Sequence, residues 1–450
     1  MPQRRDYIDE LKGLGILLVV LGHFIEQYRM GYSFVSASFF CIYAFHMALF
    51  CICSGLVARF NPRKLVTQQL WLYLVGQTLM LAFRAAVLRE NFAETGGLLA
   101  AWLLPWRHIW YLYALIFWHL TLPVLCRLRD RLGLAGSCLG MALAVGLALM
   151  LYYAAHKQGY HVDELYTYEL ANYPGGFYAL EDGYMDSWHD GSFYSAVLTP
   201  GRLFDYTIPW NNQKIDVHPP LYYCLIYTAE SLFPQLGLPW VGLLPNFVCI
   251  LAGAAVLYCT AKRLIGRFWP AWTAAACWLL CVGVQGMAVF TRMYSLMMLE
   301  GIVLLYCHVV LWQALQAGQK PPRAVWPGLF AVTMAGALTQ YFFLVFCFFV
   351  CGLFGVWLLA ARRFKTAGGY VIAEFAALAA AYAAFPTMKA HIFSGSRGKE
   401  AFASVFDLSA LAEWGRSIGT VVQLLAAQFG GLWLWAVVVA AAAVVLWRRG

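Results

Sequence analysis

Long runs of apolar residues constrain the fold of this 450-residue chain more than any other feature. The hydrocarbon core of a bilayer is about 30 Å thick, and a helix needs about 20 apolar residues to cross it. Many segments reach that length, among them 35–58, 67–87, 133–154 and 341–361. Because a backbone in lipid must satisfy its own hydrogen bonds, these segments are predicted to be helices. We therefore expect an all-α integral membrane protein with about 12 or 13 transmembrane helices.

The charged residues are few and clustered. They make up 12% of the chain, against roughly 25% in soluble domains. The net charge is +9, but the basic residues lie in short groups between apolar runs. That pattern is typical of cytoplasmic loops rather than of a nucleic-acid-binding surface. It predicts a multi-pass protein of the cytoplasmic membrane whose partners include the lipid bilayer and no nucleic acid. The groups are Arg4 and Arg5; Arg59, Arg63 and Lys64; Arg127, Arg129 and Arg131; Lys262, Arg263 and Arg267; Lys320 and Arg323; Arg362, Arg363 and Lys365; Arg448 and Arg449.

The segment 155–217 is predicted to be a long external loop, because the basic groups on either side of it are assigned to the cytoplasm. It is rich in acidic residues. Loops of such length are uncommon unless they carry structure or function, so we expect short interfacial helices around 163–172 and 184–197. Two apolar segments follow, at 221–233 and 240–260. The alternation of basic groups requires an odd number of crossings there, and the sequence leaves open whether the first segment crosses.

Ionisable and thiol groups inside the apolar runs are sparse. The spacing of the 13 cysteines predicts neither a disulfide framework nor a zinc site. Glu300 and Glu374 are the clearest acidic residues within apolar runs, and each is isolated in the sequence. A transporter should instead show several ionisable residues along a path. A transporter or a non-catalytic membrane protein is therefore an alternative to an enzyme, and it is the less favoured one.

Residues 1–126 contain the stretches RRDYIDELKGLGILLVVLGHF, AFHMALFCICSGLVARF and HIWYLYALIFW. These stretches resemble the N-terminal part of the acyltransferase-3 family, membrane enzymes that O-acetylate surface sugars. The resemblance implies functional roles for Lys12, His23 and His46, with His23 as the base for an acceptor hydroxyl. The family usually has arginine where Lys12 stands, proline where Ala48 stands, and more helices than this stretch can hold. We expect an incomplete acyltransferase-like fragment, and an O-acyltransferase of surface sugars is an alternative function.

Four motifs follow in residues 133–450: YHVDELYTYELA, KIDVHPPLYYCLIY, FTRMYSLMMLEGIVLLY and LTQYFFLVF. In this order they resemble the GT-C superfamily of membrane glycosyltransferases, in particular the protein O-mannosyltransferases and the enzymes that add aminoarabinose to lipid A. The resemblance implies a sugar donor linked to polyprenyl phosphate and an acceptor that is a glycan, lipid or protein of the cell envelope. It also implies an active site on the extracytoplasmic side and inversion at the anomeric carbon.

The first motif carries an acidic pair, Asp163 and Glu164. An acceptor hydroxyl must lose its proton as it attacks the anomeric carbon, and a carboxylate at the membrane boundary suits that role. We predict Asp163 as this catalytic base. Glu164 is predicted to assist, either by orienting Asp163 or by holding a divalent cation through hard oxygen ligands. The alternative is that Asp163 only caps the helix that follows it.

The leaving group would be a phosphate, which nearby positive charge stabilises. Arg292 is the first candidate, because the arginine fork matches phosphate oxygens; His218 and Lys214 are weaker candidates. Alternatively, Arg292 anchors a helix end at the interface, and His218 merely precedes a helix that begins with two prolines.

The same motifs predict the substrate-contacting residues. A sugar offers hydroxyls to polar side chains and an apolar face to aromatic rings, and these motifs supply both types of side chain. For the tyrosines of the second motif, Tyr222 and Tyr223, the alternative is a place in the interfacial aromatic belt. The predicted contacts are Asp216, Tyr222, Tyr294, Gln340 and Tyr341.

Overall fold

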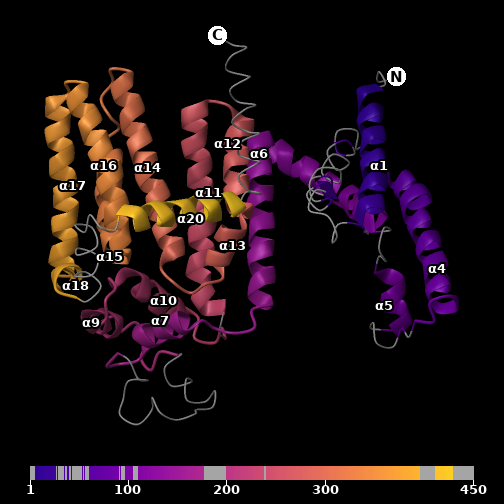
Figure 1. The fold of residues 1–450 in the computed structure, drawn as a ribbon, viewed down its shortest axis with the longest axis horizontal. Coiled ribbons are helices and arrows are strands. Elements are labelled where there is room, and N and C mark those ends of the chain that lie inside the picture. The colour runs from indigo at the N-terminus through magenta and orange to yellow at the C-terminus, as the bar shows by residue number, and fades with distance from the viewer. Residues whose placement is uncertain are drawn as a thin grey trace. The chain divides into compact units, whose positions relative to one another are not determined.

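The part of the chain that the computed structural model describes is mainly helical and contains no strand (Figure 1). Contacts divide the chain into two compact units, Met1–Ser137 (unit 1) and Cys138–Gly450 (unit 2), and each is considered by itself. The all-α class is therefore confirmed for the described residues, while the predicted number of transmembrane helices stays a prediction. The described residues are 6–26, 28, 60–90, 92, 97–104, 110–176, 199–237, 240–395 and 411–428, with single positions between 35 and 55.

Unit 1 contains α1, a short helical stretch that leads into α4, then α5 and the first arm of α6. Polar side chains join α4 to α5: the Tyr73 hydroxyl donates to the Leu103 carbonyl (2.7 Å), and the Trp102 indole N–H donates to Thr78 Oγ1 (2.9 Å). The bounds are α1 Asp6–Glu26, α3 Pro62–Lys64, η1 Leu65–Leu70, α4 Trp71–Ala86, α5 Gly97–Leu103 and α6 Trp110–Ala155.

The long helix α6 bends sharply at Gly133, whose φ of 70° and ψ of 172° interrupt the helical conformation. A positive φ is favourable for glycine because it lacks a Cβ atom. The basic residues at 127–131, predicted to form a loop, instead continue the first helical arm up to this bend. The bend separates two apolar arms, and the division between the two units follows shortly after it.

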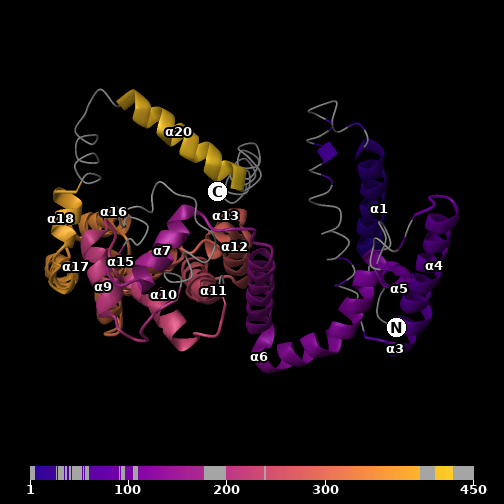
Figure 2. The same ribbon diagram turned by 90° about the horizontal axis from the view of Figure 1, so that it is seen from below.

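Unit 2 is a bundle of long helices with several short helices at one end (Figures 1 and 2). Among the described residues of the whole chain, five helices are long and apolar enough to cross a membrane: α6, α11, α14, α16 and α17. The pair α12 and α13, bent by 56°, makes a sixth if it is one broken span. The bounds are α7 Val162–Asn172, α9 Thr207–Ile215, α10 Leu221–Leu232, α11 Trp240–Ile265, α12 Phe268–Leu280, α13 Val282–Ala288, α14 Tyr294–Gln316, α15 Val325–Thr339, α16 Tyr341–Ala360, α17 Phe364–Ala384, α18 Met388–Phe393 and α20 Leu411–Gln428.

The length of helix α10 bears on the number of crossings between Asp216 and Lys262, which the sequence left open. Its 12 residues span about 18 Å, too short for a hydrocarbon core of about 30 Å. It packs against α7, α9 and the start of α11 at the same end of the bundle (Figure 2). Among the described residues between Asp216 and Lys262, only α11 is long and apolar enough to cross a membrane, which fits the alternation expected of the basic groups.

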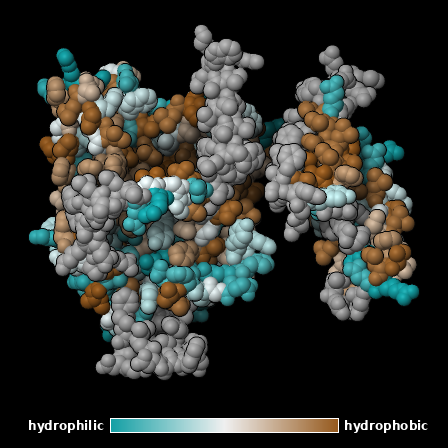
Figure 3. Space-filling model, viewed as in Figure 1, coloured by the Kyte–Doolittle hydropathy of each residue, from teal (hydrophilic) through white to brown (hydrophobic). Residues whose placement is uncertain are grey.

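The two ends of the unit 2 bundle differ in charge. We call one the basic end: the C-terminus of α11 and the α14–α15 and α16–α17 turns, which carry the basic groups from Lys262 to Lys365. The other, the α7 end, consists of α7, α9, α10, α18, the segment before α14 and the start of α16 (Figure 1). Hydrophobic side chains cover much of the helical part between the ends, and hydrophilic ones gather towards α7 (Figure 3).

A buried aromatic layer seats α7 on the bundle. Tyr168 of α7, Tyr223 and Ile226 of α10 and Met293 before α14 are all fully buried and pack together. A Cβ atom on Gly242 of α11 would lie 1.9 Å from the Tyr168 hydroxyl, so only glycine permits this close approach. The polar residues of the α7 end lie on this buried layer, which holds them in place.

Candidate functional site at the α7 end

The first turn of α7 is fixed by a capping box. His161 occupies the N-cap, where its Nδ1 accepts from the Asp163 N–H (3.1 Å) and Glu164 Oε2 accepts from the His161 N–H (3.0 Å). The alternative that Asp163 only caps the helix is therefore wrong. The Asp163 side chain is 41% exposed, and its Oδ2 lies 3.7 Å from His161 Nδ1. Of the acidic pair, Asp163 is the member that a substrate can reach.

Glu164 is buried, with its side chain 1% exposed. Its carboxylate accepts hydrogen bonds from Lys157 Nζ (2.8 Å) and from the backbone N–H of Thr291 (2.8 Å), besides that of His161. Lys157 Nζ also donates to the Val289 carbonyl (2.9 Å). These contacts tie α7 to the segment before α14. Since the carboxylate oxygens are occupied inside the protein, the geometry favours a positioning role for Glu164 over contact with substrate or a cation.

Arg292, the residue after Thr291, is brought beside the predicted base. It is 5% exposed, and its Nη1 donates to the Asp163 carbonyl (3.3 Å) and to Thr167 Oγ1 (3.2 Å). Its Nε has no hydrogen-bond acceptor. Among the described residues, no carboxylate forms an ion pair with this guanidinium. Such burial does not fit the alternative of a side chain that only anchors a helix end at the lipid interface.

A histidine–aspartate pair lies next to Arg292. His218 Nδ1 is 2.7 Å from Asp216 Oδ2, and its Nε2 is 3.4 Å from Arg292 Nη2. The tautomer with the proton on Nδ1 satisfies both contacts, because Nε2 then accepts from the guanidinium. Burial acts to raise the pKa of Asp216, but the hydrogen bond from His218 and the charge of Arg292 lower it below its ordinary value.

The two tyrosines of the second motif are fully buried, at 1% and 0% exposure, so the alternative of an interfacial belt is wrong for both. The Tyr222 hydroxyl donates to Asn246 Oδ1 (2.9 Å), and Asn246 Nδ2 donates to the Phe290 carbonyl (2.7 Å). These two hydrogen bonds support the segment that carries Arg292. Tyr222, predicted to contact substrate, is thus placed in the supporting core, while Tyr223 lies within electrostatic reach of Arg292 and Asp216.

The remaining predicted residues of the α7 end are less central. Lys214 is exposed and donates to Asn211 Oδ1 (2.8 Å), away from the Arg292 contacts. Gln340 caps α16 by accepting from the Tyr341 N–H (2.8 Å), and the Tyr341 hydroxyl is 2.8 Å from His391 Nδ1. Tyr294 is half-buried, and its ring is stacked on that of Phe290 with the ring centroids 6.2 Å apart.

Several residues of this network were not predicted. Thr167 could have been found, because it follows Asp163 by four positions and so shares its helix face. Lys157 and His391 offered no such signal, since each reaches the network from another segment. His391 lies within electrostatic reach of Asp216 and His218, and burial lowers its pKa despite the raising effect of the Lys214 backbone contact and of Asp216.

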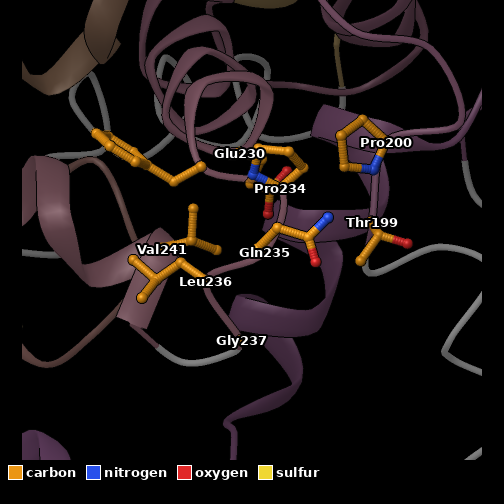
Figure 4. A pocket seen from close by; sticks show the side chains of 9 residues that line it. Thr199, Pro200, Glu230, Pro234, Gln235, Leu236, Gly237 and Val241 are labelled. Atoms are coloured by element: carbon orange, nitrogen blue, oxygen red, sulfur yellow. The ribbon is translucent and has the colours of Figure 1, made fainter.

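A separate cavity of about 320 Å³ opens beside the last turn of α10 (Figure 4). Glu230 lines it together with Thr199, Pro200 and Gln235. Glu230 is 2% exposed, and burial raises the pKa of its carboxyl to about 8, with the neighbouring Asn172 side chain acting in the opposite direction. Glu230 is therefore mainly protonated at neutral pH and can donate a hydrogen bond.

The acyltransferase-like residues of unit 1 do not form a comparable group. Lys12 and His23 share a face of α1 but lie about 16 Å apart along its axis, given a rise of about 1.5 Å per residue. His23 Nδ1 is 3.2 Å from Glu26 Oε2, and its side chain is 38% exposed. His46 lies outside the described residues.

Comparisons with known proteins find no match among protein-family models, curated proteins or solved structures.

Proposed function

We propose that unit 2 is a membrane glycosyltransferase that moves a sugar from a polyprenyl-phosphate donor to a glycan, lipid or protein of the cell envelope. The observation that carries the proposal is Arg292, a buried arginine without a carboxylate ion partner among the described residues, beside Asp163. A buried positive charge that is not neutralised is costly and calls for an anion. The phosphate of the donor supplies one.

The orientation of the bundle supports an extracytoplasmic site. The basic turns gather at the end opposite α7 (Figure 1), and basic loops favour the cytoplasmic side. With the basic end in the cytoplasm, the α7 end faces outward. This is the side on which a lipid-linked donor that has crossed the cytoplasmic membrane meets envelope acceptors.

The phosphate of the donor would bind at Arg292. The guanidinium has an unsatisfied Nε donor, and its Nη groups are held by neutral partners only. As the bond between the anomeric carbon and the phosphate oxygen breaks, negative charge grows on the leaving polyprenyl phosphate. A preorganised positive charge stabilises that change more than it stabilises the ground state.

The acceptor hydroxyl would be deprotonated by Asp163. Its oxygen forms the new bond to the anomeric carbon, its proton passes to the exposed carboxylate, and the polyprenyl phosphate leaves from the opposite face. One displacement of this kind inverts the anomeric configuration. His218, oriented by Asp216, holds the Arg292 guanidinium in place, and Glu164 holds the backbone beside it.

The test uses the full chain, purified into lipid nanodiscs and supplied with envelope extract as the acceptor source. A panel of polyprenyl-phosphate sugars, each with a radiolabelled sugar, is added with and without Mg²⁺. We expect one label to move to the acceptor fraction with wild-type protein and not with Asp163→Asn. The proposal is wrong if no label moves, or if the variant transfers as fast as the wild type.

A further inference from the structure

Three side chains of metal-ligand type meet in the interior of the unit 2 bundle, far from the α7 end. They are His308 of α14, Cys351 of α16 and Glu374 of α17, and their ligand atoms lie within 4.8 Å of one another. Cys351 and Glu374 are each ten positions from the first residue of their helix, about 15 Å along its axis. The group therefore lies near the middle of the predicted membrane thickness. Glu374, isolated in the sequence, is not isolated in the fold.

The imidazole of His308 is held as a metal ligand would be. Its Nδ1 is 2.8 Å from the Leu304 carbonyl one helical turn earlier, so the ring proton lies on Nδ1 and the lone pair on Nε2. Histidines that bind metals usually donate the other ring N–H to a carbonyl or carboxylate in this way. Nε2 lies 2.7 Å from the Tyr370 hydroxyl, which donates to it.

The carboxylate of Glu374 is only half satisfied. Its Oε2 accepts from Thr333 Oγ1 (2.9 Å), whereas its buried Oε1 has no hydrogen-bond partner. The residue is 8% exposed. An ionisable group at membrane depth is costly and marks function by default. A buried, unpartnered oxygen close to an imidazole and a thiol is an arrangement that a cation would satisfy.

A second thiol lies beside the first. Cys347 Sγ is 3.5 Å from Cys351 Sγ, one turn earlier on α16. Two thiolates on one tetrahedral zinc ion, each at about 2.3 Å, would lie about 3.8 Å apart. Cys347 thus lies next to the group, outside its three ligands.

We propose that these residues bind a zinc ion that ties α14, α16 and α17 together. His308 Nε2, Cys351 Sγ and Glu374 Oε1 are the ligands, and imidazole, thiolate and carboxylate are the groups that zinc takes in proteins. On binding, the Cys351 thiol releases its proton to solvent. The two positive charges of zinc then balance one thiolate and one carboxylate, so the occupied site is neutral, as an apolar interior requires.

Metal content tests the proposal on the full chain in detergent, independently of any transfer activity. After chelation and titration with zinc chloride, we expect about one zinc per wild-type chain. Cys351→Ser and Glu374→Gln should bind it at least about tenfold more weakly. Glu300→Gln is the matched control: Glu300 is also a buried carboxyl of this bundle that accepts from a threonine, Thr339 (2.7 Å). The proposal is overturned if both site variants keep wild-type affinity or if Glu300→Gln loses zinc equally.

Cobalt substitution keeps the proposal testable if a variant fails to fold. Co²⁺ bound to a thiolate gives an intense near-ultraviolet charge-transfer band, which we expect for the wild type. The band should be lost in Cys351→Ser and kept in Tyr370→Phe, because Tyr370 only occupies Nε2 while the metal is absent. Folded wild-type protein that shows neither this band nor bound zinc overturns the proposal.

Discussion

The two ends of the unit 2 bundle use arginine in opposite ways. At the basic end, Arg263 is exposed and makes contacts with Gln313 and Tyr306. At the α7 end, Arg292 is 5% exposed and held by a backbone carbonyl, a hydroxyl and an imidazole. An exposed arginine in the last turn of a helix contributes to orientation in the membrane through its charge. A buried arginine needs polar partners inside the protein. Its presence indicates a functional site rather than a role in membrane orientation.

The largest expected effect is at the predicted base. Asp163→Asn should lower sugar transfer about 100- to 10,000-fold, because an amide cannot take the acceptor proton. Initial rates of label transfer in nanodiscs measure the change. Asp205→Asn is the control, since Asp205 is another partly exposed aspartate at the same end. Equal losses in both variants would mean that the effect is general to the α7 end and not specific to a base.

Glu164→Gln should destabilise the protein by about 3 kcal/mol, because it leaves the Lys157 ammonium without its buried partner. Thermal unfolding in detergent gives the change in stability. The double variant Glu164→Gln/Lys157→Met removes both charges and should recover part of the loss. If the single variant is as stable as the wild type, the ion pair does not hold α7 in place.

Arg292→Ala should lower transfer about 100- to 1,000-fold, as expected when a group that stabilises leaving-group charge is removed. We expect a lower kcat and a higher KM for the donor, whereas the KM for the acceptor should stay unchanged. Arg292→Lys keeps the charge but lacks the planar guanidinium, and its transfer rate should lie between those of the wild type and Arg292→Ala. An unchanged donor dependence in Arg292→Ala would exclude this residue from the phosphate site.

Asp216→Asn should cost about 2 kcal/mol of stability at neutral pH, the scale of a buried hydrogen bond to a charged group. The folded protein lowers the pKa of this carboxyl, so its contribution is complete above the ordinary aspartate pKa and is lost as the pH falls through the lowered value. We expect the difference in the free energy of unfolding between variant and wild type to disappear only at strongly acidic pH. Unfolding measured from neutral to strongly acidic pH tests this. A gap that closes near neutrality would contradict the carboxylate–histidine pair.

The smallest effect is expected at the basic end. Arg263→Ala should change stability by less than about 1 kcal/mol and leave transfer near the wild-type rate, because exposed charges contribute little. Rates and unfolding midpoints measured beside those of Arg292→Ala provide the comparison. A loss as large as that of Arg292→Ala would remove the distinction between the two ends.

The sequence predicted a helix at α7 and the meeting of Asp163 with Arg292, because motif order placed both on one side of the membrane. It assigned different roles to the two members of the acidic pair, but it did not predict that Glu164 is buried. Glu164 is buried by Lys157 and by the backbone of Thr291, 127 positions away, and no local pattern shows such partners. The roles assigned to these residues stay predictions.

Two other features of the structure differ from what the sequence predicted. One has a local cause, and the other arises where distant segments meet. The basic residues at 127–131 were predicted to form a loop, but charge marks a membrane boundary without ending a helix, and the bend comes at Gly133. The zinc-ligand group was missed because three helices contribute one residue each. Spacing rules for metal sites find ligands that are close in sequence, and these are not.

The shortness of α15 has a consequence for how a lipid-borne substrate would approach. Its 15 residues cover about 22 Å, some 8 Å less than the hydrocarbon thickness of about 30 Å. If Arg323 lies at the cytoplasmic surface, as the proposed orientation has it, Gln340 at the end of α15 would lie below the outer boundary of the bilayer. Under the proposed function, a polyprenyl-linked donor would then reach this level by lateral diffusion, without lifting its phosphate out of the leaflet.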